Sequence, residues 1–468
     1  MLDAIRSEEL RPEARDLLAE LGSAGLTPIA AAEQLAYLVY LARLPKRGIR
    51  VPPKFDWAYL RSQSPEISLA ALRGDGYRAL ASSLPHRDGF TDTLDDAVFA
   101  LGTARLLKAA IKGIERLGLA TEPPERAGPA WEAILTEAAI SGVGGQFRTP
   151  RYIVEALVQL AAPPPGALIC DPAAGTGGVL IAASRSDRNG RPPQRWRRDG
   201  GHVSGFDVDP TMVRLGVVNL LVHGIEPPRL EVRDSLAPDF GHRNEAAFVI
   251  TAPPFGPHRV VDGVATDLSV GAAAKRSEVL FLELGLRLAE RSGGRVVTVV
   301  PDSLLASSSR PLTRAREELL SEHRVDAVVS LPVNAFRPYS RVATAIMSVT
   351  TGRPTTDVRF ARLTEGGFLQ GLGGVPAGHQ ALSEVIGWAR GADVPSHELE
   401  HAAMTTIEIS TILDNGARLS PSFYLPPDEE AAPPDDPLAI IAELRDLDSG
   451  VLAAMAQVEQ FVASLGVT

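Results

Sequence analysis

The sequence predicts an α/β protein with a doubly wound, mainly parallel sheet, an α-helical N-terminal domain and a helical C-terminal tail. Three observations lead to this class. Strand-like and helix-like segments alternate from about residue 150 to 350, which is typical of a parallel sheet with helices on both faces. A glycine-rich turn follows the first strand-like run. Before residue 140 and near the C-terminus, apolar residues recur at helical spacing.

Strands and helices are expected to alternate along the central part of the chain. Apolar runs predict strands at 167–171, 203–208, 229–233, 246–251, 294–300, 325–331 and 343–350. Amphipathic segments predict helices near 152–160, 178–185, 210–223, 277–291 and 310–322. Ligands of such sheets bind at the carboxyl ends of the strands, beside the point where the strand order reverses.

The turn after the first strand reads Ile-Cys-Asp-Pro-Ala-Ala-Gly-Thr-Gly-Gly over residues 169–178. Its glycines at 175, 177 and 178 permit positive φ and let backbone amides approach a ligand at the N-terminus of the next helix. Such a turn is suited to a nucleotide-like molecule. The alternative is a glycine turn that serves only tight packing.

The N-terminal region is predicted to be an α-helical domain over residues 1–140. Thr27 is expected to cap a helix whose first position is Pro28. A second helix is expected to begin near Thr93. Its apolar stripe would contain Leu94, Val98, Leu101, Leu107, Ile111 and Ile114. Neither helix carries a group of residues that indicates chemistry.

The strands are expected to end near Thr364, and residues 366–468 form a predicted C-terminal region. It contains the stretch Asn-Gly-Ala-Arg-Leu-Ser-Pro-Ser-Phe-Tyr-Leu at 415–425 and a proline-rich, acidic linker at 426–437. A heptad pattern follows, formed by Ile440, Leu444, Leu447, Val451, Ala454, Val458, Phe461 and Leu465. This seam requires a partner helix, either from another subunit or from the same chain.

Composition limits the class of protein. Of the 468 residues 45% are hydrophobic and 22% are charged, and no apolar run reaches the length of a membrane span. The N-terminus has no signal-like pattern, so a cytoplasmic location is expected. Cys170, the single cysteine, excludes an internal disulfide and is expected to be a buried strand residue.

The net charge of −10 argues against a protein that grips nucleic acid over its whole surface. Residues 185–202 form an arginine-rich segment that predicts a surface loop. Its charges are suited either to contact with phosphate or simply to solvation.

Acidic residues stand at the ends of three successive predicted strands. Asp171 ends the first, Asp207 the second and Asp234 the third. A carboxylate at the second position can accept both hydroxyls of a ribose. Each residue alone is better explained as a turn or helix-cap aspartate. Together, beside the glycine turn, they favour an adenosine-containing ligand.

The fourth strand ends in Thr251-Ala252-Pro253-Pro254-Phe255. Two prolines hold the chain extended and stop the sheet. The ring of Phe255 is expected to be exposed at the crevice, where it can stack on a flat substrate such as a flipped base. A simple strand stop with a core phenylalanine is the alternative.

These segments resemble a known family. Residues 147–150, 171–178, 205–210, 233–236 and 251–256 have the order and spacing of the amino-group DNA methyltransferases of the adenine-N6 class. The wider chain, including 275–289, 293–302 and 330–339, is similar to the modification subunit of type I restriction-modification systems. The resemblance covers roughly residues 20–360 and implies a Rossmann-like methyltransferase domain at 141–365.

The resemblance implies S-adenosylmethionine as cofactor, with Thr149 and Asp171 near its methionine end, Asp207 on the ribose and Asp234 by the adenine. The full implied cofactor set is Gln146, Phe147, Thr149, Asp171, Ala173, Gly175, Thr176, Gly177, Asp207 and Asp234. It also implies a flipped adenine on Phe255, with Ala252, Pro253, Pro254 and Phe255 as the catalytic loop. No metal is required.

The implied partners are DNA and a specificity subunit in a hetero-oligomer, without a membrane. Whether a nuclease subunit takes part is left open. The stretch at 415–425 and the heptad tail are similar to parts of specificity subunits, which suggests that the partner docks there.

The chain departs from the family at the fourth strand, because Ala252 stands where the motif has asparagine. An exocyclic adenine amine is a poor nucleophile, and the asparagine carbonyl accepts its hydrogens as the methyl arrives. Alanine offers no acceptor, and loss of one such group typically costs about 3 kcal/mol, on the order of 10²–10³ in rate. Thr251 is a poor substitute because neighbouring strand residues point to opposite faces. Methyl transfer is therefore expected to be very slow or absent, with cofactor binding retained.

Two origins of Ala252 remain open: an engineered change in a competent enzyme, or a natural pseudoenzyme. The alternative function is a non-catalytic, S-adenosylmethionine-binding assembly subunit of a phage-defence complex. Methylation of protein glutamine is a third option, which the helical N-terminal region and the heptad tail disfavour.

Overall fold

The structure is a computed structural model that describes residues 2–73, 80, 89–140, 148–185, 202–241, 246–256, 263–289, 293–336, 342–364, 379–393 and 402–426. Residues 1–425 form one compact unit. The second unit, residues 426–468, holds the predicted linker and heptad tail, and all but its first residue lie outside the described ranges. The boundaries between the three predicted domains stay predictions.

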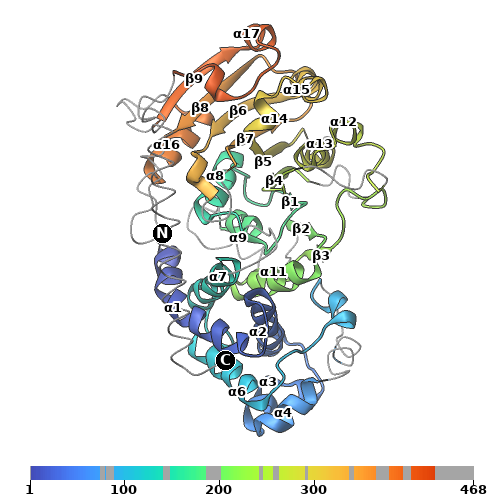
Figure 1. Cartoon of the computed structure of the whole chain (residues 1–468), viewed down its shortest axis with the longest axis vertical. Coiled ribbons are helices and arrows are strands. Elements are labelled where there is room, and N and C mark those ends of the chain that lie inside the picture. The colour runs from blue at the N-terminus through green and yellow to red at the C-terminus, as the bar shows by residue number, and fades with distance from the viewer. Residues whose placement is uncertain are drawn as a thin grey trace, which may run out of the picture. The chain divides into compact units, whose positions relative to one another are not determined.

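The N-terminal part is α-helical (Figure 1). The helix expected to begin at Pro28 is confirmed, since the Thr27 side chain accepts a hydrogen bond from the Ala30 amide and Pro28 takes the first position. The α-helices are α1 (Leu2–Gly22), α2 (Pro28–Arg43), α3 (Trp57–Ser62), α4 (Pro65–Leu72), α6 (Ala104–Arg116) and α7 (Pro124–Ile140). Short 3₁₀ helices lie at Leu44–Arg47, Pro53–Phe55 and Thr91–Asp96.

The predicted helix from Thr93 is wrong in its first part. Helix α6 begins at Ala104, where the Thr103 side chain accepts the Leu106 amide and caps the helix. Leu94 lies in a 3₁₀ helix and Leu101 in an irregular segment, and both are buried. Val98 between them is 69% exposed. The apparent stripe arose because apolar residues of non-helical backbone happened to continue the helical spacing of α6.

Within the described ranges, the central sheet has nine strands in the order β3-β2-β1-β4-β5-β7-β6-β8-β9. Their bounds are β1 (Ile169–Asp171), β2 (Val203–Asp207), β3 (Leu230–Val232), β4 (Phe248–Thr251), β5 (Arg295–Pro301), β6 (Arg324–Ser330), β7 (Thr344–Thr350), β8 (Asp357–Leu363) and β9 (Ala402–Glu408). Strands β1 to β5 run parallel, β7 is antiparallel to β5 and β6, and β9 is antiparallel to β8. The predicted mainly parallel sheet is confirmed.

Helices cover both faces of this sheet (Figure 1). One face carries α8 (Arg151–Ala161), α9 (Gly178–Ser184), α11 (Pro210–Val222) and α16 (His379–Ala389). The other carries α13 (Ser277–Ala289), α14 (Asp302–Ala306) and α15 (Arg310–Glu322), with α12 (Ser269–Ala274) beside α13. Strand β5 shows the alternation that this layering needs: Val297 and Val299 join one core, and Val296 and Val300 the other.

The sheet extends further than the sequence indicated. Strand β8 was not foreseen, and β9 contradicts the expectation that strands end near Thr364. Strand β9 reads Ala-Ala-Met-Thr-Thr-Ile-Glu and lies at the sheet edge, where its side chains are half-buried or exposed. Its formation depends on pairing with β8 rather than on a local apolar run.

The stretch at 415–425 packs within the chain, after α17 (Ile409–Asp414) and around a 3₁₀ helix at Pro421–Phe423. The Leu419 amide donates to the Leu305 carbonyl, and the Ser420 hydroxyl donates to Asp302 at 2.6 Å. Leu419 and Ser420 are therefore buried and unavailable to a docking partner, while Phe423 is 45% exposed.

Candidate active site

The strand order reverses between β1 and β4, and the crevice beside that point is formed by the segments that follow these two strands. After β1 the chain makes the predicted glycine turn. Gly175 and Gly177 have φ values of 51° and 75°, which only glycine adopts without strain. Gly177 is the N-terminal cap of α9, so the turn leads directly into this helix, as the sequence predicted.

Asp171 ends β1 and is buried under the crevice. Its Oδ1 accepts hydrogen bonds from the Thr251 hydroxyl at 2.7 Å and from the Ala173 amide at 3.1 Å. Burial raises the pKa of this carboxyl to about 7, because desolvation outweighs the two hydrogen bonds that stabilise the carboxylate. The group can therefore change its charge near neutral pH.

The two other acidic positions differ in their surroundings. Asp207 accepts the Gly175 amide and the Asp209 amide, each at 2.9 Å, so it ties the end of β2 to the glycine turn. Burial raises the pKa of Asp207 as well. Asp234 is exposed, and its Oδ1 accepts the Leu236 amide at 2.9 Å.

The loop after β4 carries the residues of the predicted catalytic motif. Ala252 and Phe255 are half-buried and pack against the apolar core, Pro253 is buried, and Pro254 is exposed. The expectation of an exposed Phe255 ring is therefore wrong, since core packing covers part of it. The Gly256 amide donates to Glu278 at 2.9 Å and its carbonyl accepts the Ser277 amide, so the N-terminus of α13 holds the loop.

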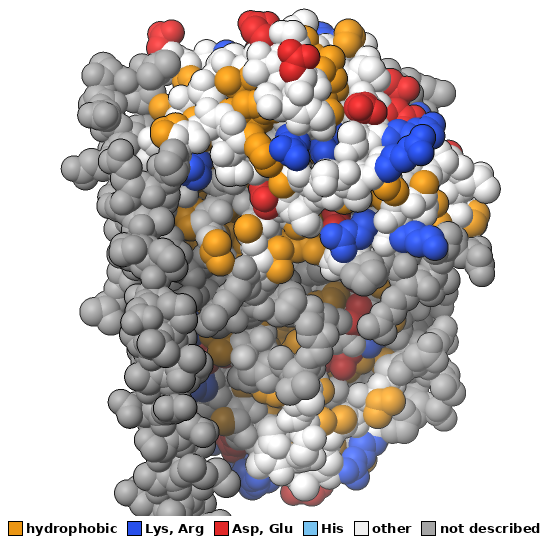
Figure 2. Space-filling model, turned by 45° about the horizontal axis from the view of Figure 1, so that its top comes forward, with side chains coloured by type: hydrophobic (Ala, Val, Ile, Leu, Met, Phe, Trp, Pro, Cys, Tyr) orange, Lys and Arg blue, Asp and Glu red, His pale blue; other side chains and the backbone are white. Residues whose placement is uncertain are grey.

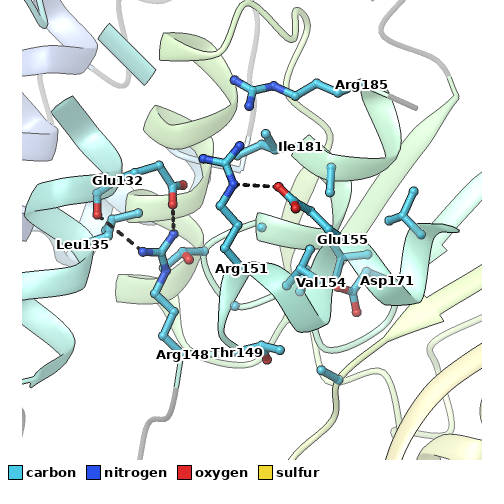
Figure 3. A pocket seen from close by; sticks show the side chains of 18 of the residues that line it. Glu132, Leu135, Arg148, Thr149, Arg151, Val154, Glu155, Asp171, Ile181 and Arg185 are labelled. Carbon is cyan, nitrogen blue, oxygen red and sulfur yellow. Dashed lines mark hydrogen bonds and ion pairs between the residues drawn. The ribbon is translucent and has the colours of Figure 1, made fainter. Parts of the chain in front are cut away.

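A cavity of about 770 Å³ opens beside the glycine turn (Figure 3). Of the predicted site residues it is lined by Thr149, Asp171, Ala173, Gly175, Thr176 and Ala252. Gly177, Asp207, Asp234 and the rest of the Pro-Pro-Phe motif do not line it. Gln146 and Phe147, both predicted cofactor residues, lie outside the described part of the chain.

Charged residues that the sequence did not single out also line the cavity. Arg151 pairs with Glu155 along α8 at 2.8 Å, and Arg148 pairs with Glu132 from α7 (Figure 3). Arg148 stands next to Thr149 in a segment already singled out by its motif. Glu132 gave no signal, because it lies in a helical region without any recognisable group of chemical residues.

Within the described residues, no group of three or more His, Cys, Asp or Glu side chains is arranged to hold a metal ion. None of the helices in the described ranges has both the length and the hydrophobicity needed to cross a bilayer.

The sheet, the glycine turn and the crevice define a Rossmann-like methyltransferase fold, as predicted. A chain solved in a study of the assembly and conformational transition of the type I restriction-modification system has a TM-score of 0.71 at 22% identity, over 97% of each chain. The methyltransferase subunit of a type I restriction-modification system from Streptococcus thermophilus gives 0.68 at 18% identity, over 90% of this chain and 100% of that one.

The chain belongs to the N-6 DNA methylase family, whose model matches residues 124–371. It is 28% identical over 271 residues to the EcoEI type I restriction enzyme methylase subunit of Escherichia coli, which is 57% of this chain and 54% of that protein. It is 24% identical over 332 residues to the EcoKI methylase subunit of E. coli K12, with 65% and 60% covered. The chain thus matches little more than half the length of these relatives.

Proposed function

We propose that this chain is the modification subunit of a type I restriction-modification complex, built to transfer a methyl group from S-adenosylmethionine to the N6 amine of adenine in DNA. One observation carries this proposal: the glycine turn, the buried Asp171 and position 252 of the Pro-Pro-Phe loop all line a single cavity. Membership of the N-6 DNA methylase family and the likeness to type I methylase subunits support the assignment of the substrate.

The residues of the cavity fit S-adenosylmethionine. A Cβ added at Gly175 or at Gly178 would meet nothing within 4 Å, so open space lies against the turn. Thr149, Asp171 and Ala173 would hold the methionine end of the cofactor. The turn at Gly175 and Thr176 would lie beside the cofactor, with Asp207 at the ribose and Asp234 at the adenine. When bound, the cofactor supplies the electrophilic methyl group.

The chain's own residues would orient the target base. Pro253 and Pro254 keep the loop extended, and the clamp between Gly256 and Glu278 fixes the end of this loop. Phe255 lies between these two constraints. Because its ring is half-buried, we expect only one face or edge of the ring to be offered to a flipped adenine.

We propose that methyl transfer by this chain is impaired at Ala252. The side chain has no acceptor for the hydrogens of the adenine amine, and the neighbouring Thr251 hydroxyl is buried and donates to Asp171. Loss of one preorganised acceptor at a reacting centre costs about 3 kcal/mol, on the order of 10²–10³ in rate. This same observation favours the second candidate function, a non-catalytic, cofactor-binding assembly subunit of a phage-defence complex.

We also propose that productive DNA binding requires a specificity subunit, with which the chain forms a hetero-oligomer. On the face seen in Figure 2, basic and acidic side chains are interspersed rather than segregated, and the chain carries a net charge of −10. A protein with this charge distribution is expected to gain a strong, salt-dependent grip on the phosphate backbone from a basic partner. The heptad tail at 440–465 is the proposed docking element.

The deciding experiment measures transfer of a labelled methyl group to DNA, with and without a specificity subunit. Three proteins are compared: the chain as given, Ala252→Asn, and Ala252→Leu as a control of similar size without an acceptor. We expect Ala252→Asn to gain activity by about 10²–10³-fold and the leucine variant to stay inactive. Bound cofactor with no gain in Ala252→Asn would favour the assembly subunit. Full turnover by the unaltered chain would contradict the impairment.

A further inference from the structure

A carboxylate from the N-terminal helical region reaches the wall of the cofactor cavity. Glu132 lies on α7, its side chain is only 13% exposed, and it lines the cavity together with Arg148 (Figure 3). Its two carboxylate oxygens have different partners. Oε2 pairs with the Arg148 guanidinium, and Oε1 accepts the Asn219 side-chain amide at 3.2 Å. Glu132 therefore connects two segments that are far apart in the sequence.

The first segment is the one that precedes α8. Arg148 donates to the Glu132 carboxylate, to the Thr136 hydroxyl at 2.8 Å and to the Glu132 carbonyl at 3.4 Å. All of these acceptors belong to α7. Arg148 is followed directly by Thr149, a cavity-lining residue of the proposed methionine site. The position of this wall of the cavity is thus set by α7.

The second segment is the glycine turn. Asn219 is fully buried on α11, and the same Nδ2 that donates to Glu132 also donates to the Thr176 carbonyl at 2.9 Å. Its Oδ1 has no partner within the described ranges, so the two donated bonds orient the amide. Through Asn219, the Glu132 carboxylate is linked to the centre of the turn.

The helix that presents Glu132 is firmly placed. The neighbouring Trp131 is fully buried, and its indole N–H donates to the Leu215 carbonyl of α11 at 3.3 Å. Burial alone would raise the pKa of Glu132. The charges of Arg148 and His223, with the hydrogen bonds from Arg148 and Asn219, instead lower it to about 2, so the group is ionised at neutral pH.

We propose that Glu132 is a positioning residue of the cofactor site: it holds the Thr149 segment and the glycine turn at the separation that S-adenosylmethionine requires. This inference rests on the proposed function. It also assigns the helical region a role in cofactor binding, because α7 supplies the group that joins the two walls. A binding site held in its bound arrangement loses less free energy when the ligand orders it.

The test measures the Kd for S-adenosylmethionine of the full chain by calorimetry. Glu137→Gln is the matched control, since Glu137 is also a buried carboxylate of α7 that pairs with two arginines, Arg11 and Arg15, but it does not line the cavity. We expect Glu132→Gln to weaken binding about tenfold and Glu137→Gln to leave the Kd within about twofold, even if both lower the melting temperature.

A second measurement determines how fast the backbone amides of the glycine turn exchange hydrogen in the absence of cofactor. Hydrogen exchange of a peptide covering residues 171–180 is expected to be faster in Glu132→Gln and in Asn219→Ala, and unchanged in Glu137→Gln. If Glu132→Gln does not fold, Arg148→Lys replaces it in both measurements. Binding by the unaltered chain together with an unchanged Kd in the Glu132 or Arg148 variant would overturn the role of Glu132. Absence of binding by the unaltered chain would instead contradict the proposed function.

Discussion

The Thr251 hydroxyl donates a hydrogen bond of 2.7 Å to the carboxylate of Asp171, which lies 80 residues earlier in the chain. Both side chains are only 1% exposed. The bond joins the ends of β1 and β4 directly beneath the crevice. Thr251 is the polar residue nearest in sequence to Ala252, and its burial keeps its hydroxyl away from a substrate amine.

Replacing Thr251 by valine should destabilise the fold. The change removes the hydroxyl at nearly constant volume and leaves a buried carboxyl with one hydrogen bond fewer, which costs about 1–3 kcal/mol. Urea unfolding measures this loss. Thr251→Ser, which keeps the hydroxyl, should lose clearly less than the valine variant. A valine variant as stable as the unaltered chain would show that this hydrogen bond does not contribute to stability.

The free energy of unfolding should depend on the protonation of Asp171. Its pKa rises from 3.8 to about 7 on folding, so between these values the folded chain holds a proton that the unfolded chain has released. The contribution of this group to stability is therefore fully present below about pH 4 and is lost as the pH rises through about 7.

Asp171→Asn removes this titration, and the measurement is the difference in free energy of unfolding between the variant and the unaltered chain. We expect the difference to shift in favour of the variant as the pH rises through the window. A difference that does not change with pH would show that Asp171 is not titrating there.

Two glycines near the turn should respond differently to alanine. At Gly178 an added Cβ meets nothing within 4 Å and the residue lines the cavity, so Gly178→Ala should leave stability within about 0.5 kcal/mol. Because the methyl group enters space that the cofactor would use, the Kd for S-adenosylmethionine should rise about tenfold.

At Gly216 on α11, an added Cβ would lie 2.3 Å from Leu230 and 3.1 Å from the Gly175 carbonyl. Gly216→Ala should therefore lower the free energy of unfolding by about 1–3 kcal/mol through overpacking. Thermal unfolding and calorimetry distinguish the two effects. Normal cofactor binding by Gly178→Ala would mean that the cofactor does not lie against the turn.

Arg316 fastens the stretch at 415–425 to the rest of the chain. Its guanidinium is buried and donates to the carbonyls of Ala417, Leu304 and Ser307 at 2.7–2.8 Å. Arg316→Met should leave these acceptors unsatisfied and cost more than about 2 kcal/mol. Trypsin should then cleave after Arg418 faster than in the unaltered chain.

Arg314→Met is the control for this change, because Arg314 is an exposed residue of the same helix. Its stability and its trypsin digestion pattern should match those of the unaltered chain. If trypsin cleaved after Arg418 at the same rate in the two variants, Arg316 would not be what holds the stretch at 415–425 in place.

Local patterns predicted the elements whose signals are local. The glycine turn, the Thr27 cap and the strands that end in Asp171 and Asp207 are all read within a few residues, and each lies where it was expected. The helix expected from Thr93 was wrong because periodicity cannot distinguish helical from irregular backbone in a short apolar segment.

By itself, the sequence determined the class of sheet, the order of the motifs around the crevice and the absence of an acceptor side chain at position 252, because these follow from residue type and spacing. The tertiary structure decided which distant groups meet. Strand β9 forms by pairing with β8, and packing against the core buries part of the Phe255 side chain. Packing also brings Glu132 to Asn219, which links it to the glycine turn. Such contacts depend on how elements pack, and the amino-acid sequence around each of these residues carries no local signal for them.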